Sequence, residues 1–419
     1  MKYLKFVLII VSSTYLNGNA QQIRDSIYNA NIKTIQLYKK GWELSYPIIT
    51  LNSDEKLVLG FDDLSKNIKS YYYTLIHCDS EWEVSNLNYS EYCDGFEQNQ
   101  FNKPLFSTNT TVNYIHYSLI IPNENCTPLI SGNYILKVFE DLDQTKLVFT
   151  KRLYIVENTA NIDLLVLRPE ISKYMMKYQQ YRIKVTPNIP DFTDLKTEIK
   201  TVAIQNFNTS YAQECYLSTL ADNILHYEDL DSNLFEGGNE YRNFDIKSLK
   251  YQSPHIQYIE FKDSIYNIVL HPEEWRNKKQ YFTDIDLNGN YYIENKAGVI
   301  KERDADYFNV HFELPNNGPF VDGDLYIYGA LSYWQCNKTN KMNYNFNKRA
   351  YELNLLLKQG YYNYQIAYVS KDNNKIDLSF AEGNHYETEN DYLVLVYYKS
   401  AIGRYERLIG YQKANSLNK

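Results

Sequence analysis

The segment GNYILKVFED, residues 132–141, opens on the turn signal Gly132-Asn133 and continues as a short run of aromatic and aliphatic residues. Such runs between turn residues are typical of β-strands. The same part of the chain holds four more of them: LVLGFDDL (57–64), YYYTLIHCD (71–79), TVNYIHYSLIIP (111–122) and LVFTKRLYIVE (147–157). The spacing of the five runs predicts an immunoglobulin-like β-sandwich.

The composition extends this prediction to the whole chain. A chain of 419 residues is longer than those that usually fold around one hydrophobic core. Its length therefore predicts two or three domains. The chain holds 43 Tyr, and aromatic side chains favour pleated strands over long helices. We therefore expect an all-β protein of immunoglobulin-like or E-set-like β-sandwich domains in tandem. A net charge of −8 argues against a nucleic-acid-binding surface, which is usually basic.

We place the domain boundaries at changes in this strand pattern. The first sandwich takes residues 21–157, and the polar stretch 158–161 follows it as a linker. A middle β-rich domain takes residues 158–300. The last block, residues 301–419, again has short strand-like runs and predicts an E-set or glycogen-binding-type sandwich.

Residues 1–20 have the pattern of a secretory signal peptide. Lys2 and Lys5 precede a short apolar stretch, and small residues lead to Ala20. We expect cleavage between Ala20 and Gln21. The apolar stretch is shorter than the roughly 20 residues that a membrane span needs, and no later segment reaches that length. We therefore expect an exported protein with no direct membrane span.

An oxidising compartment makes the five cysteines candidates for disulfide bonds. Cys78 and Cys93 are close enough in sequence to bridge a hairpin-like loop, and we take them as the candidate pair. Unpaired buried thiols are an equal alternative. No cysteine spacing matches a zinc site.

The stretch EGNHYETENDYLVLVYY, residues 382–398, gathers carboxylates around His385 just before an apolar run. No catalytic motif of fixed spacing accompanies it, and lone carboxylate clusters are weak signals of catalysis or metal binding. We interpret it as a polar edge that leads into a central strand at residues 392–398, because that run is apolar on both faces.

The stretch DIDLNGNYYIEN offers the candidate metal ligands Asp284, Asp286 and Asn288, which match the opening of a calcium loop. The closing position, which calls for Glu, holds Asn295. Asp, Asn and Gly are also what a tight β-turn selects. We therefore favour a turn.

Aromatic residues in the last block raise the possibility of sugar binding, with Trp334 as the candidate platform. Period-two alternation places Tyr362, Tyr364, Ile366 and Tyr368 on one strand face, which a sandwich would bury. We favour a core role for these residues. A periplasmic glycan-binding protein is the alternative function.

A set of short strings, in a distinctive order along nearly the whole mature chain, resembles the type IX secretion system plug protein family. The strings are HCDSEW (77–82), EYCDGF (91–96), SGNYILKV (131–138), RLYIVE (152–157), YRNFDIKSL (241–249), DLNGNYYIENK (286–296), ADYFNVHFELP (305–315), YIYGALSYW (326–334), YELNLLLKQGYYNYQIAY (351–368), AEGNHYETENDYLVLVYY (381–398) and RLIGY (407–411).

This resemblance implies a function as well as a fold. It implies a non-enzymatic periplasmic protein that seals the periplasmic mouth of a giant SprA-type outer-membrane β-barrel translocon when no cargo is engaged. It implies no cofactor. A secreted hydrolase with an unrecognised site is a third hypothesis, which would need activity from residues such as His385 or Glu387.

Overall fold

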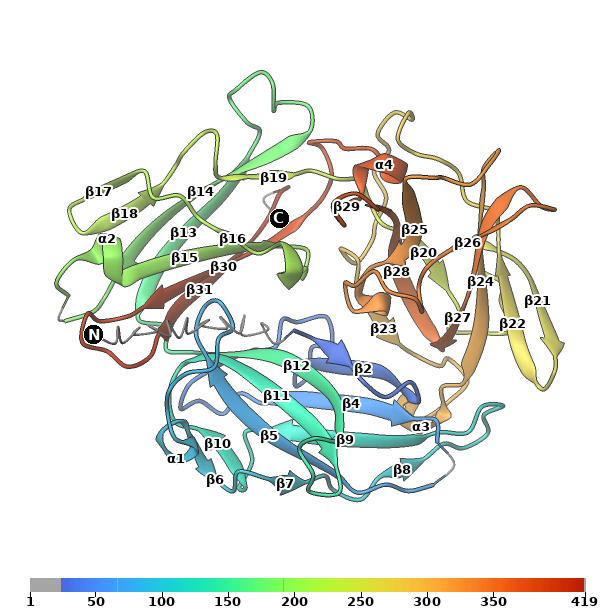
Figure 1. Cartoon of the computed structure of the whole chain (residues 1–419), viewed down its shortest axis with the longest axis horizontal. Helices are drawn as coiled ribbons and strands as arrows, with labels where there is room; N and C mark the ends of the chain where they lie inside the picture. The colour runs from blue at the N-terminus through green and yellow to red at the C-terminus, as the bar shows by residue number, and fades with distance from the viewer. Residues whose placement is uncertain (1–23, 66, 191, 418–419) are drawn as a thin grey trace, which may run out of the picture.

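The computed structural model describes residues 24–65, 67–190 and 192–417. Its regular structure is almost entirely β-strand, arranged in sandwiches around a common centre (Figure 1). The predicted all-β sandwich fold is therefore confirmed. The predicted signal peptide and the cleavage site between Ala20 and Gln21 lie outside the described residues.

The first sandwich, residues 26–156, contains all five predicted strands. The segment quoted first becomes β11 (Gly132–Glu140), which lies between β5 (Tyr71–Cys78) and β12 (Leu147–Val156). Tyr134, Leu136 and Val138 point from one face of β11 into the core, because successive side chains of a strand alternate between its faces. The remaining elements of this sandwich are β1 (Ser26–Ile27), β2 (Ile32–Lys39), β3 (Ile48–Thr50), β4 (Leu57–Asp63), α1 (Tyr89–Tyr92), β6 (Cys93–Gly95), β7 (Asn99–Gln100), β8 (Leu105–Phe106), β9 (Ile115–Ile121) and β10 (Cys126–Pro128).

The second sandwich combines two distant parts of the chain, residues 160–236 and 391–415. One of its sheets places β15 (Ile199–Gln205) beside β30 (Asp391–Tyr398), and β31 (Arg407–Asn415) forms the next strand. In Figure 1 these C-terminal strands lie among the green strands of the second sandwich. The remaining elements are β13 (Ala160–Leu167), β14 (Tyr178–Pro187), α2 (Leu195–Glu198), η1 (Thr209–Tyr211), β16 (Gln213–Glu214), β17 (Thr219–Ala221), β18 (Ile224–Tyr227) and β19 (Leu234–Glu236).

The third sandwich, residues 242–382, is inserted between the two parts of the second. Its longest strand, β28 (Gly360–Ser370), pairs with strands from both sides of residue 300. Its elements are β20 (Arg242–Asp245), β21 (Ile256–Lys262), β22 (Ile265–Leu270), β23 (Tyr291–Ile293), α3 (Lys301–Asp304), β24 (Tyr307–Pro315), β25 (Gly323–Tyr328), η2 (Ala330–Ser332), β26 (Asn343–Asn345), β27 (Ala350–Lys358), β28, β29 (Ile376–Asp377) and α4 (Ser379–Glu382).

This strand pairing differs from the domain boundary predicted at residue 300, between residues 158–300 and 301–419. Strand β20 pairs with β28 across that boundary, and β30 returns to pair with β15. The sequence pattern missed this because long-range strand pairing leaves no local signal: each strand shows only which of its faces is buried.

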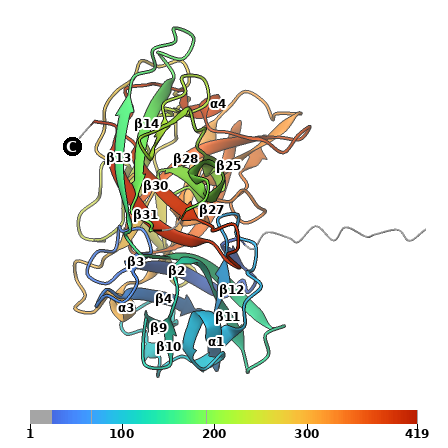
Figure 2. The same cartoon turned by 90° about the vertical axis from the view of Figure 1, so that its left-hand side faces the viewer.

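Strand β30 is buried on both faces, as its sequence predicted. Tyr392, Val394 and Val396 enter the core of the second sandwich. Leu393 and Leu395 enter a separate apolar core, which also contains Ile135 from the outer face of β11. The second sandwich thus packs on the first through this shared core, and Figure 2 shows β30 and β31 directly above β12. Each fully buried Leu or Ile stabilises such a junction by about 1.5–3 kcal/mol.

None of the helices within the described residues has the length and apolar character needed to cross a bilayer.

We predict that a chain ending at residue 390 keeps the first sandwich but loses the second. Without β30 and β31, strand β15 keeps only β16 as a neighbour, and the core loses Tyr392, Val394, Val396, Tyr398 and Ile409. Hydrogen exchange should show loss of protection in β13–β15, with β5 and β11 retained. A chain ending at residue 417 is the control. Native protection of β15 in the shorter chain would contradict this arrangement.

Candidate functional site

Buried polar side chains gather where the three sandwiches meet, and they define the candidate functional region of the molecule. It has three parts: an ion cluster between the first and third sandwiches, a double connection between the second and third, and a cavity at the centre.

The ion cluster centres on Asp62, which is fully buried in β4. Its Oδ1 lies 2.7 Å from Nδ1 of His116 in β9. Its Oδ2 accepts hydrogen bonds from the Tyr307 hydroxyl at 2.6 Å and from Lys358 Nζ at 2.6 Å. Tyr307 and Lys358 belong to the third sandwich, so one carboxylate joins two sandwiches.

The charge of Asp62 is stabilised by these partners. Burial alone would raise the pKa of Asp62, but Lys358 and the hydrogen bond from His116 hold it below its ordinary value. Lys358 is itself buried, and its Nζ lies 4.1 Å from the ring centre of Tyr114 and donates to the carbonyl of Glu302. The sequence analysis missed this site, although a charged residue within an apolar strand run, as in LVLGFDDL, was a usable signal.

Two segments run side by side between the second and third sandwiches: residues 237–241 leave the second, and residues 382–390 return to it. Gly238 accepts a hydrogen bond from the backbone N–H of His385 at 2.8 Å, and Asn390 Nδ2 donates to the Gly237 carbonyl at 2.8 Å. A Cβ on Gly237 would lie 2.0 Å from the His385 carbonyl oxygen, so only glycine allows this close approach.

Glu382 anchors the returning segment. Its side chain is fully buried, with Oε1 2.9 Å from Arg242 Nε and Oε2 3.2 Å from Arg276 Nε. The backbone N–H of Ile366 also donates to Oε1, at 2.8 Å. Burial would raise the pKa of Glu382, but the two guanidinium groups and the backbone donor hold it below its ordinary value.

The other polar residues of EGNHYETEND follow Glu382 along the returning segment and into the start of β30. Burial lowers the pKa of His385, against the opposing effect of Glu387. Glu389 and Asp391 both accept hydrogen bonds from Asn415 Nδ2, at 3.0 Å each. Within this stretch, Glu382 is thus held by arginines of the third sandwich, and Glu389 and Asp391 are held by Asn415 of the second.

The candidate metal ligands lie beside this connection. Oδ1 of Asp286 accepts from the backbone N–H of Asn288 at 2.6 Å, and its Oδ2 accepts from the backbone N–H of Tyr241. Asn288 Nδ2 donates to Asp391 at 2.9 Å, whereas Asp284 is exposed. Asn288 and Gly289 have positive φ angles, as a tight turn requires. No group of three or more metal-ligating side chains occurs in the parts of the chain that the structure describes.

The electrostatics of Asp286 are unusual. Burial raises its pKa to about 7, and the carboxylates of Glu240 and Glu389 add to this effect against the two backbone donors. Burial also raises the pKa of Glu240. The connection therefore contains carboxyl groups whose ionisation disfavours the folded state.

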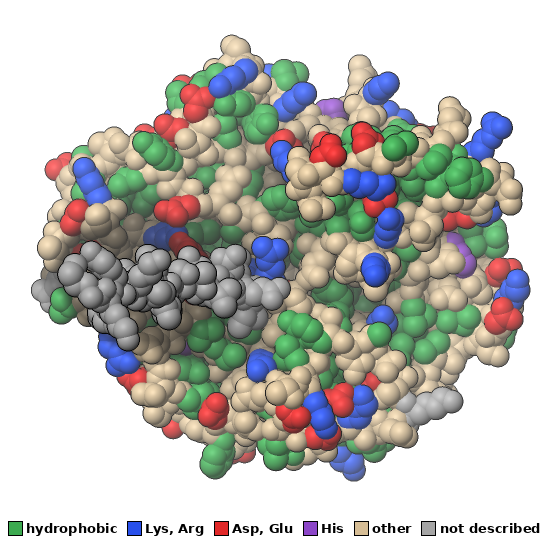
Figure 3. All heavy atoms as spheres, viewed as in Figure 1, with side chains coloured by type: hydrophobic (Ala, Val, Ile, Leu, Met, Phe, Trp, Pro, Cys, Tyr) green, Lys and Arg blue, Asp and Glu red, His purple; other side chains and the backbone are tan. Residues whose placement is uncertain are grey.

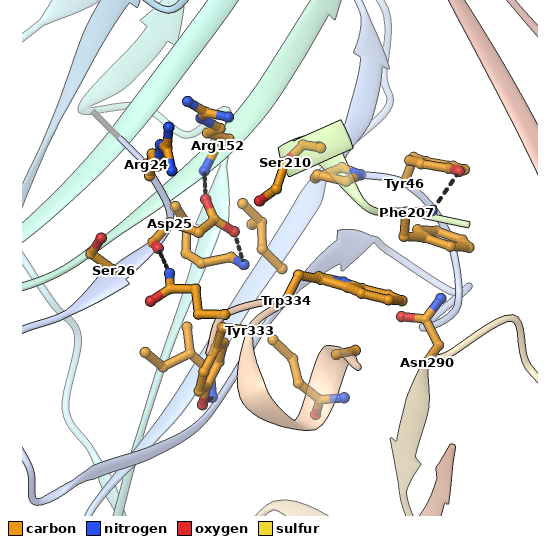
Figure 4. A pocket seen from close by; sticks show the side chains of 18 of the residues that line it. Arg24, Asp25, Ser26, Tyr46, Arg152, Phe207, Ser210, Asn290, Tyr333 and Trp334 are labelled. Carbon is orange, nitrogen blue, oxygen red and sulfur yellow. Dashed lines mark hydrogen bonds and ion pairs between the residues drawn. The ribbon is translucent and has the colours of Figure 1, made fainter. Parts of the chain in front are cut away.

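A cavity of about 600 Å³ lies where all three sandwiches meet. Figure 4 shows Asp25 and Arg152 of the first sandwich, Phe207 of the second, and Tyr333 and Trp334 of the third around it. The cavity walls are fixed by contacts between the sandwiches: Tyr46 stacks on Phe207 with ring centres 3.8 Å apart, and the Tyr333 hydroxyl accepts from the backbone N–H of Ile35.

Trp334, the candidate sugar platform, lines this cavity but is held by other aromatic residues. Its ring meets those of Tyr241 and Tyr328 nearly at right angles, with centres 6.3 Å and 5.7 Å apart. A Cβ on Gly289 would lie 2.4 Å from the far end of the indole. Tyr362, Tyr364 and Ile366 lie in the core of the third sandwich with Tyr368 packed against it, which confirms the predicted core role of that strand face.

The structure separates the two cysteines of the predicted disulfide. Cys78 lies at the end of β5 and points into the junction with the second sandwich, whereas Cys93 lies in the core of the first sandwich. Side chains alternate along β5, so Cys78 points to the face opposite Tyr73 and Leu75, which enter the core that holds Cys93. The neighbour of Cys93 is Cys126, and the two Sγ atoms are 3.3 Å apart.

Comparisons with known proteins bear on the whole chain. Residues 32–157 match the family described as Type 9 secretion system plug protein 1st domain. A crystal structure of a hypothetical protein from Parabacteroides merdae matches with a TM-score of 0.90 and 31% sequence identity, over 94% of this chain and 99% of that one. No curated protein matches the sequence.

We predict that Lys358→Met destabilises the protein by about 3–5 kcal/mol, because it leaves the buried Asp62 carboxylate without its cation. Adding Asp62→Asn should recover part of this loss, so the two substitutions will not be additive in urea unfolding. Lys146→Met, which removes an exposed ion pair, is the control and should cost under about 1 kcal/mol. Strict additivity of the first two would disprove the coupling.

We predict that Asp286 makes stability fall as the pH rises. Its folded-state pKa of about 7 lies above that of an unfolded Asp, about 3.9, so its contribution is fully present below about pH 4 and lost by about pH 7. From pH 5 to pH 7.5, the free energy of unfolding should fall by about 2 kcal/mol more in the native chain than in Asp286→Asn. Asp284→Asn, at an exposed site, should match the native profile. Identical profiles for Asp286→Asn and the native chain would refute the assignment.

Proposed function

The chain belongs to the type 9 secretion system plug protein family, and we propose that it binds and seals the periplasmic mouth of the outer-membrane β-barrel through which this system exports its cargo. Family membership gives the chain a role in type IX secretion. The proposal adds a partner, a giant SprA-type barrel, and a place, the periplasmic face of the outer membrane.

The observation that carries the proposal is that three sandwiches are joined into one body by buried contacts on every side. The first and second share an apolar core, the first and third share the Asp62 ion cluster, and the second and third share a double connection. A protein that closes a wide pore must resist deformation, and well-packed junctions of this kind do not deform continuously. A single tandem linker would leave the domains free to move.

The surface fits a partner that is later released. On the face shown in Figure 3, side chains of Lys and Arg, of Asp and Glu, and of hydrophobic residues are mixed over the surface. Exposed apolar residues occur on all three sandwiches, for example Phe96 on the first, Ile402 on the second and Phe346 on the third. Transient interfaces have this mixture of apolar and polar contacts.

We propose that the protein acts without catalysis. Asp62 and Glu382, two fully buried carboxylates, each meet cationic partners that hold them ionised. Groups held in this way are poor general acids at neutral pH. Glycan binding by Trp334 would have to take place inside the central cavity, because the indole lines that cavity and its ring is packed against Tyr241 and Tyr328.

The test is recovery of the partner from the native envelope. A photo-crosslinking amino acid is placed at Phe96, Ile402 or Phe346 in the tagged mature chain, one position at a time. After irradiation and gentle solubilisation, we expect a giant outer-membrane barrel to be attached to at least one of the three and identified by mass spectrometry. A matched control carries the same amino acid at the buried position Leu136, which faces only the first sandwich's core.

Sealing is measured separately, as uptake of a large hydrophilic probe that an intact outer membrane excludes. Cells that lack the protein should take up more probe, and the native chain should reverse this. Recovery of the chain free of any barrel, with unchanged probe uptake, would reject the proposal. In that case, sugar binding that is lost in Trp334→Ala, or an enzymatic activity lost in Glu387→Gln, would identify one of the alternatives.

A further inference from the structure

We propose that Cys93 and Cys126 form a disulfide bond that cross-links the first sandwich. The proposal rests on the position of the two sulfur atoms and does not depend on the proposed binding to a barrel.

The two cysteines lie on a short antiparallel ladder. Strand β6 pairs with β10 so that Cys93 is opposite Pro128 and Gly95 is opposite Cys126, which makes the cysteines diagonal neighbours. Their Sγ atoms are 3.3 Å apart, and both residues are buried in the core of the first sandwich. A Cβ on Gly95 would lie 2.1 Å from the carbonyl oxygen of Asn125, so glycine lets the two strands approach this closely. A small movement of the side chains brings the sulfurs to bonding distance.

The surroundings of the two thiols differ in the folded, reduced chain. The Tyr89 hydroxyl lies 3.1 Å from Cys93 Sγ and 3.7 Å from Cys126 Sγ. The hydrogen bond from the Cys126 thiol, assisted by Tyr89 and a backbone N–H, lowers the pKa of Cys93 against the effect of burial, whereas the pKa of Cys126 is raised. The two sulfur atoms therefore already contact each other in the reduced fold, in the arrangement that the bond would lock.

The reaction balances with a disulfide-class oxidant such as oxidised glutathione or a thiol–disulfide oxidoreductase. In the partly folded chain, the thiolate of one of the two cysteines attacks the oxidant's disulfide and releases one thiol, forming a mixed disulfide. The other cysteine then loses its proton, attacks the protein sulfur of the mixed disulfide and releases the second thiol. Two protein thiols are oxidised, and one oxidant disulfide is reduced to two thiols. Because both sulfurs are buried in the finished fold, the bond forms before the sandwich closes over them.

The other three cysteines lie apart from this pair and from one another. Cys78 faces the junction of the first and second sandwiches, Cys215 lies in the core of the second, and Cys336 lines the central cavity. The bond would close the segment from Cys93 to Cys126, which contains β9, a central strand of the sheet that faces β11. It would therefore restrict the unfolded chain and favour assembly of the two sheets.

The test counts free thiols. The mature chain is refolded with oxidised glutathione, or isolated from the periplasm, and then denatured with excess alkylating reagent. We expect label on Cys78, Cys215 and Cys336 only, and a peptide pair joined through Cys93 and Cys126 in the digest. Label on all five cysteines, or a bond between Cys93 and Cys78, would overturn the proposal.

Stability gives a second, independent measurement. Reducing the native chain should lower the Tm of the first sandwich by about 5–10 °C, the size expected for loss of a native disulfide. Cys93→Ser should show the lower Tm with and without reductant, whereas Cys215→Ser should keep the response to reductant. An unchanged Tm on reduction of the native chain would count against the bond.

Discussion

The structure depends on one strand that has no exposed face. Strand β30 supplies alternate side chains to the core of the second sandwich and to the core shared with the first. The chain reaches this place only after the residues of the third sandwich, which separate β30 from its partner β15 in the sequence. The third sandwich is therefore joined to the second by two segments of chain that run side by side and are hydrogen-bonded to each other. A single flexible linker would give only one connection.

This arrangement explains why charged groups are buried far from any recognised catalytic motif. A junction between sandwiches removes water from the polar groups that it covers. An unpaired charge in such a place is costly. The cation of Asp62 comes from another sandwich, so that ion pair forms only when the first and third sandwiches are in the correct relative position, whereas Glu382 meets arginines of its own sandwich. The same contacts that neutralise the charge thus specify the arrangement, as hydrogen-bonded buried ion pairs do in some other proteins.

Sequence analysis predicted those features that leave a local pattern. The five strands of the first sandwich were visible as apolar runs between turn residues, and residues 392–398 were recognisable as a central strand because both faces are apolar. The buried face of Tyr362, Tyr364 and Ile366 followed from alternation. The neighbour of Cys93 could not be predicted, because proximity in sequence favoured Cys78 whereas the β6–β10 ladder places Cys126 beside it.

By itself, the sequence determined which segments become strands and which of their faces are buried, since side-chain alternation is a property of each strand alone. Its short strings also pointed to the family. Only the tertiary structure decided which strands pair, because β15 and β30 are brought together by a third sandwich that separates them in the chain. It also decided that Asp62 joins two sandwiches and that carboxylates near His385 are bonded by side chains from distant parts of the chain, since neither set of partners is close in sequence.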